Sequence, residues 1–208
     1  MKSNVCELRR DMSDFDIIPE EAEKVAVYNK LSDRQARRLR LLAEELIGMM
    51  PSLLKFGSGR FWIETDGSNY ELHVSVVPEN IIDVDREKIL GVSKSGKNAA
   101  AKGIINKICL AVELMMVDYS AVSAEMPVEF YNMGMVGDMS AYNTAWSLAN
   151  YKEQTNEKEE WDEMEKSIIG KLADDVLVGI TGKKIDVIVK KSFYREEIDK
   201  WHSISKKN

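Results

Sequence analysis

The chain has few of the residues on which metal sites, disulfide frameworks and histidine-dependent triads rely. Its 208 residues include two cysteines and two histidines. Cys6 and Cys109 are too few for a disulfide framework, which predicts free thiols in a reducing compartment. His73 and His202 leave little material for a histidine-rich metal site or a Ser-His-Asp triad. We therefore expect no metal site built from these residues.

Positive charge and long apolar runs are also scarce. The 29 Lys and Arg residues are outnumbered by 35 Asp and Glu residues, giving a net charge of −6 that argues against nucleic acid as a partner. No apolar run approaches the roughly 20 residues that a membrane span needs, and residues 1–10 lack the apolar core of a signal peptide. We expect a soluble, cytoplasmic protein that binds neither nucleic acid nor a membrane.

The clearest periodic stretch covers residues 33–50 and predicts an amphipathic helix. Ser32 or Asp33 can cap its start, and Pro51 predicts an end or a kink. Gly48 costs a helix about 1 kcal/mol relative to Ala, which suggests that something needs the missing side chain. Glu45 is either an ordinary exposed acid or an acid that faces a site. The predicted buried stripe consists of Leu39, Leu42, Ala43, Leu46, Met49, Met50 and Leu53.

The remaining pattern predicts an α+β fold, with a mixed or mostly antiparallel sheet and helices packed on one face. Alternating apolar residues predict two hairpins, at 60–77 around the turn residues 66–69 and at 176–191. His73 falls on the polar face of the first hairpin, where we expect a solvated side chain. Further helices are expected at 20–30, 98–117 and 161–174, and an irregular stretch at 119–150.

Residues 91–98 nearly match the phosphate-binding pattern GxxxxGK[ST]. Asn98 stands where that pattern needs a magnesium-binding hydroxyl, and no buried parallel strand leads in, so we do not expect a P-loop NTPase. A glycine-containing loop ahead of a long helix can still bind phosphate through its amides. The alternative is a solvated loop that only caps the helix. The candidate phosphate-binding residues are Ser93, Lys94, Ser95, Gly96, Lys97 and Asn98.

Two blocks carry a resemblance to a known family. Residues 167–191, SIIGKLADDVLVGITGKKIDVIVKK, resemble the last helix, strand, turn and strand of the GHKL ATPase superfamily, closest to its anti-sigma-factor and histidine-kinase-like ATP-binding domains. Residues 39–50, LRLLAEELIGMM, are similar to its N-box helix. The resemblance implies a Bergerat-type α/β sandwich at 31–193 with an insertion at about 119–160. Residues 1–30 would form an N-terminal helical extension and residues 194–208 a tail.

The resemblance also implies a site. Glu45 matches the N-box acid that orients or deprotonates the attacking water, and Met49 stands where the family has a magnesium-binding Asn. The family's adenine-reading motif has no counterpart after Val77, whereas the loop at Ser93–Asn98 would contact the phosphates of ATP. These differences predict an ATP-binding regulatory module with little or no hydrolysis and without a family-type magnesium site. The alternative is an anti-sigma-like interaction domain that binds no nucleotide. Its partner would be another protein or a second copy of the chain.

Overall fold

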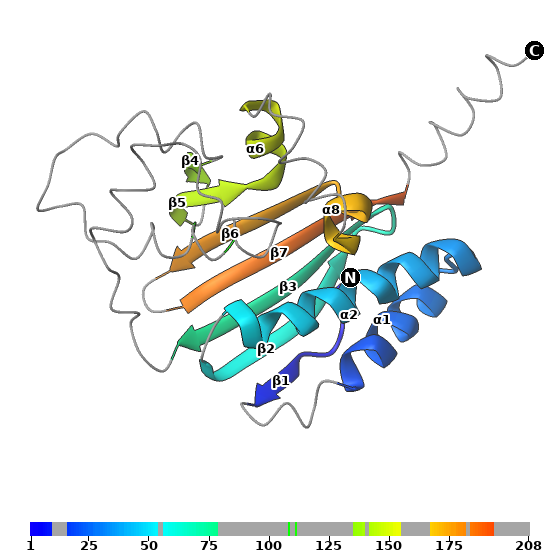
Figure 1. The fold of residues 1–208 in the computed structure, drawn as a ribbon. Coiled ribbons are helices and arrows are strands. Elements are labelled where there is room, and N and C mark those ends of the chain that lie inside the picture. The colour runs from blue at the N-terminus through cyan, green and yellow to red at the C-terminus, as the bar shows by residue number, and fades with distance from the viewer. Residues whose placement is uncertain are drawn as a thin grey trace, which may run out of the picture.

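The described part of the chain folds into a seven-stranded sheet with helices over one face (Figure 1). The computed structural model describes residues 1–9, 16–53, 56–78, 108, 111, 135–139, 142–154, 167–181 and 184–193. Helices and sheet strands occupy separate runs of this described chain, and every neighbouring strand pair is antiparallel. The predicted α+β fold class is confirmed.

The two predicted hairpins form the centre of the sheet. The strand order is β1-β2-β3-β7-β6-β5-β4, and β3 pairs with β7, so both hairpins share one sheet as expected. The strands are β1 (Cys6–Arg9), β2 (Phe56–Thr65), β3 (Asn69–Pro78), β4 (Met135–Met139), β5 (Tyr142–Ser147), β6 (Asp175–Thr181) and β7 (Lys184–Ser192).

Three of these strands are not predicted by the sequence pattern. β1 is four residues long and charged, and β4 and β5 fall inside the stretch at 119–150 that we expected to be irregular. That expectation is wrong for these strands. Their short, partly polar sequences show no clear alternation, and β5 is held by pairing with β6, about 30 residues further along the chain. Trp146 on β5 is among the largest fully buried side chains.

Alternation assigns the two faces of the sheet. Along β7 the residues from Ile185 to Val189 alternate between buried and partly exposed, and β2 and β3 do the same in register. One face therefore packs against the helices. We call the opposite face the outer face. Its central residues are Ser58, Arg60, Trp62 and Glu64 on β2, Glu71, His73 and Ser75 on β3, and Asp186, Ile188 and Lys190 on β7.

Helices α1 (Ile17–Tyr28) and α2 (Asp33–Leu53) pack against each other over the sheet, with the short α8 (Ile168–Leu172) beside α2 (Figure 1). The fourth, α6 (Leu148–Gln154), contacts β5 and β6. Helix α2 starts with a capping box. The Gln35 side-chain oxygen accepts from the Ser32 N–H at 3.0 Å and from the Ser32 hydroxyl at 2.8 Å, and the Gln35 N–H donates to Ser32 Oγ at 3.5 Å. It continues to Leu53, so of the two effects predicted for Pro51, an end or a kink, the helix does not end there.

A single hydrophobic cluster joins the helices to the sheet. The stripe predicted for α2 is confirmed from Leu39 to Met50, and Phe61 and Tyr70 of the first hairpin pack in the same cluster. The segment predicted as an N-terminal extension also contributes to this cluster, through Leu8, Ile18, Ala22, Val25 and Ala26. Of the helix predicted at 98–117, only Ile108 and Ala111 are described, and both are buried in the cluster.

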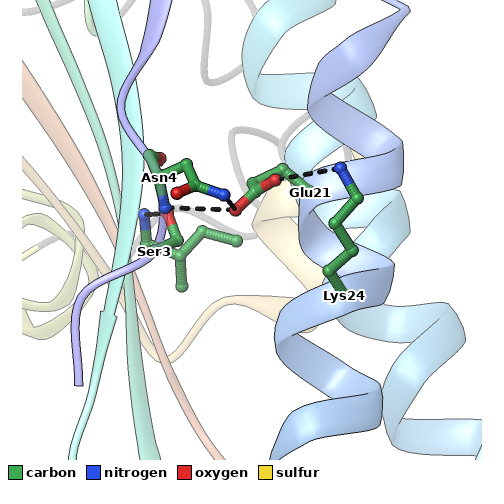
Figure 2. Close-up of polar contacts among 5 residues, drawn as sticks. Ser3, Asn4, Glu21 and Lys24 are labelled. Carbon is green, nitrogen blue, oxygen red and sulfur yellow. Dashed lines mark hydrogen bonds and ion pairs between the residues drawn. The ribbon is translucent and has the colours of Figure 1, made fainter.

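A buried carboxylate fixes the N-terminal segment (Figure 2). Glu21 on α1 is 4% exposed, and its Oε1 accepts hydrogen bonds from the backbone N–H and the side-chain amide of Asn4 at 3.1 and 3.0 Å. Lys24 Nζ lies 3.3 Å from the other oxygen. On the opposite side Ser3 exchanges two hydrogen bonds with the backbone of Ile63 in β2. The charge of Glu21 is tolerated because both of its oxygens have partners.

Candidate functional site

The predicted catalytic acid Glu45 lies on α2 and contacts the start of α8. Its Oε1 accepts hydrogen bonds from the Ser167 hydroxyl and the Ile168 N–H, both at 3.0 Å, and its Oε2 accepts from the Ile169 N–H. Ser167 itself caps the Gly170 N–H at 3.2 Å. The first amides of α8 are therefore satisfied by these two side chains, and the negative charge of Glu45 lies at the positive end of the helix.

This arrangement uses both oxygens of Glu45 for structure. The cap uses three of the roughly four lone-pair positions of the carboxylate, so a catalytic role would have only the second lone pair of Oε2 for the attacking water. From the sequence, Glu45 was predicted to be either an exposed acid or an acid facing a site. Its role as a cap for α8 was not predicted. The missing signal is tertiary, because Ser167 is 122 residues away along the chain.

Among the described residues, the position of the family's magnesium ligand lies in the hydrophobic core. Met49, at the position of the magnesium-binding Asn, is 2% exposed and packs in the hydrophobic cluster. A buried thioether is a poor ligand for hard Mg²⁺. At Gly48 an added Cβ would meet no described atom within 4 Å, so no neighbour among the described residues requires the missing side chain.

The other predicted site residues cannot be placed beside Glu45. The candidate phosphate-binding loop, Ser93 to Asn98, lies outside the described residues. Its role stays a prediction.

The two acids after α8 are also engaged. Asp175 Oδ1 accepts from the Ala149 N–H at 2.9 Å and from the Ser147 hydroxyl at 3.1 Å, so it caps the start of α6. Asp174 accepts from the Ser192 N–H at 2.5 Å and lies 3.3 Å from Lys191 Nζ. Asp174 and Asp175 therefore join the end of α8 to α6 and β7.

An aromatic and charged cluster lies on the outer face and was not predicted from the sequence. The rings of Trp62 and His73 stack at 4.8 Å with an interplanar angle of 5°, and Lys2 Nζ lies 4.4 Å from the centroid of the Trp62 ring. The Trp62 Nε1–H donates to Glu64 at 2.8 Å, which lowers the pKa of Glu64. A signal was present in the sequence, because Trp62 and His73 occupy outward positions of an alternating hairpin.

His73 is more buried than the solvated residue we expected. Its side chain is 12% exposed, and Nε2 is buried without a hydrogen bond among the described residues, with Glu71 Oε2 at 3.4 Å. Burial lowers the pKa of His73, and the nearby Glu64 and Glu71 carboxylates oppose that shift without cancelling it. His73 is therefore mostly neutral near pH 7 and supports the Trp62 ring by stacking.

No protein-family model, curated protein or solved structure matches this chain. None of the helices in the described ranges has the length and apolar character needed to cross a bilayer. Within the same ranges, no three histidine, cysteine, aspartate or glutamate side chains gather as metal ligands.

Proposed function

We propose that the chain is a regulatory module of the histidine-kinase-like, GHKL type that binds ATP without hydrolysing it efficiently. The observation that carries this proposal is the engagement of Glu45, whose two oxygens cap α8. The order of elements supports it, since an N-box-like helix precedes a hairpin and a short helix precedes the last hairpin. The burial of Met49 accounts for weak turnover, because the family's magnesium ligand is missing.

In this proposal the chain's own residues hold the phosphates through the loop at Ser93–Asn98. The amides of the glycine-containing loop and the ammonium groups of Lys94 and Lys97 provide positive charge on a chain whose net charge is −6. Glu45 keeps α8 and the following β6–β7 hairpin in position instead of activating water. Nucleotide binding would then act as a signal for a protein partner.

Calorimetry with ATP, in the presence and absence of magnesium, tests the binding step. We expect saturable binding that depends little on magnesium and that weakens at least about tenfold in the Lys94→Ala/Lys97→Ala variant, as expected for the loss of two charged contacts. The matched control is Lys30→Ala/Lys171→Ala, which removes the same charge from exposed positions elsewhere. Binding that is equal in the two double variants would refute the loop as the phosphate site.

An ATPase assay tests the absence of efficient turnover. We expect the wild type to release phosphate no faster than Glu45→Gln, with Glu44→Gln as the control because Glu44 is the neighbouring acid and is paired with Arg40 at the surface. If the Glu45 change alone abolished measurable turnover, the acid would be catalytic.

A second function is favoured by Met49, which is buried at the position of the family's magnesium-binding Asn. It is an ATPase-like interaction domain that binds a protein partner or a second copy and no nucleotide. Calorimetry separates the two functions. If the chain is an interaction domain that binds no nucleotide, the folded protein shows no saturable heat of ATP binding, with or without magnesium.

A further inference from the structure

A hollow of about 300 Å³ lies on the outer face of the sheet, and its lining extends from β1 across β2 and β3 to the start of β7. This volume is at the lower end of the range for small-molecule sites. The hollow is separate from Glu45, which lies on a helix over the opposite face. Its lining residues are Lys2, Val5, Glu7, Ser58, Gly59, Arg60, Trp62, Ser75, Val77 and Lys184.

The charge of this lining is opposite to that of the chain. Lys2, Arg60 and Lys184 give three positive charges against one negative charge from Glu7, a net of +2 on a chain of net charge −6. Such a concentration of one sign in a hollow attracts a ligand of the other sign.

Some of these polar groups are still free to bind a ligand. Lys2 is paired with Glu64 at 3.2 Å, and Arg60 uses Nε to contact Glu7 at 3.2 Å. Within the described ranges, the terminal nitrogens of Arg60 have no such partner, and Lys184 has no ion pair.

Two hydroxyl groups add to this set. Neither Ser58 nor Ser75 makes a side-chain hydrogen bond to the part of the chain that the structure describes. Two cationic donors and two hydroxyls suit the oxygens of a carboxylate or a phosphate.

The rest of the lining is apolar and partly fixed in place. Val5 and Val77 are 46% and 38% exposed, so they present uncovered apolar surface. Trp62 is held by its stack on His73 and by its bond to Glu64, so little side-chain entropy remains to be lost when a ligand packs against it.

We propose that this hollow binds a small organic anion. Its carboxylate or phosphate contacts Lys184, Arg60 and the two serine hydroxyls. Its apolar body packs against Val5, Val77 and the edge of the Trp62 ring, because His73 and Lys2 lie over the faces of that ring. The proposal does not depend on nucleotide binding at residues 93–98. The anionic group provides the charge contacts, and the apolar body distinguishes the ligand from an inorganic ion.

NMR titration of the full chain tests this site, with the indole N–H resonance of Trp62 as the reporter and Trp62→Phe to assign it. The probes are phenyl phosphate and benzoate, which separate a phosphate from a carboxylate ligand, together with inorganic phosphate and phenol. We expect a saturable shift with at least one aromatic anion, which binds about tenfold tighter than inorganic phosphate or phenol. Saturation by one anion and not by the other identifies the ligand's charged group.

Lys184→Ala should weaken the binding of the tighter-binding aromatic anion about tenfold, because the change removes one charge-assisted contact. The control is Lys190→Ala, which removes the same charge from the same strand and face but lies outside the hollow and is paired with Glu71. We expect that control to bind as the wild type does. Absence of a saturable Trp62 shift with both aromatic anions would overturn the proposal, and so would equal weakening in the two lysine variants. Inorganic phosphate binding as tightly as phenyl phosphate would overturn the apolar part of the site.

Discussion

Replacement of Glu45 by alanine should destabilise the fold substantially, although Glu45 is a partly exposed acid on a helix. The change removes the acceptor for the Ser167 hydroxyl and for the first two amides of α8. It also removes a negative charge from the positive end of that helix. Part of the loss is made up by water, because the Ile168 contact is exposed.

The size of the effect follows from the contacts. The loss of a helix-capping side chain costs roughly 0.5 to 2 kcal/mol, and a hydrogen bond to a charged group contributes about 1.5 to 3 kcal/mol. Since the three contacts share one carboxylate and are not additive, we expect a loss of about 2 kcal/mol in the free energy of unfolding. For a chain of this length that corresponds to a drop of roughly 4 to 8 °C in Tm.

Urea unfolding followed by circular dichroism measures this difference, with Glu44→Ala as the matched control. Glu44 is adjacent and forms a surface ion pair with Arg40 at 2.7 Å, a contact that contributes about 0.3 to 0.5 kcal/mol. If the two variants lost the same stability, Glu45 would not cap α8 in solution, and the argument against its catalytic use would fail.

Three other changes have a defined direction. Lys30→Gly should stabilise the chain by about 1 kcal/mol in urea unfolding, because Lys30 has φ 54° at the end of α1 and glycine carries no Cβ penalty there; the same change at Asn29, with φ −86°, should not. Gly48→Ala should add up to about 1 kcal/mol by the same measurement, and a loss would reveal a neighbour that the described residues do not include. Burial holds the pKa of His73 below its ordinary 6.5, so the unfolded chain takes up the proton first and stability should fall as pH drops below that value. Wild type should lose more stability than His73→Gln between about pH 7.5 and about pH 5.5, and equal losses would contradict the burial of the imidazole.

The sequence alone predicted those elements whose side chains repeat with a clear period. The stripe on α2 and the alternation in the two hairpins report burial directly, because a residue's position along a helix or strand decides which face it occupies. The α+β class followed from the order of these elements. The turn at Asp66 was also readable, since its carboxylate accepts the Ser68 and Asn69 amides and these bonds lower the pKa of Asp66 to about 2.

Tertiary structure decided what depended on distant partners. The strands β4 and β5 carry no strong pattern; β5 is held by pairing with β6, and β4 by pairing with β5. Glu45 became a cap only because the fold brings Ser167 to it across 122 residues. His73 was assigned to the correct face, but its burial depends on Trp62 from the neighbouring strand. Local propensity fixes which way a side chain points, whereas its protonation, partners and availability to a ligand depend on residues that only folding brings within reach.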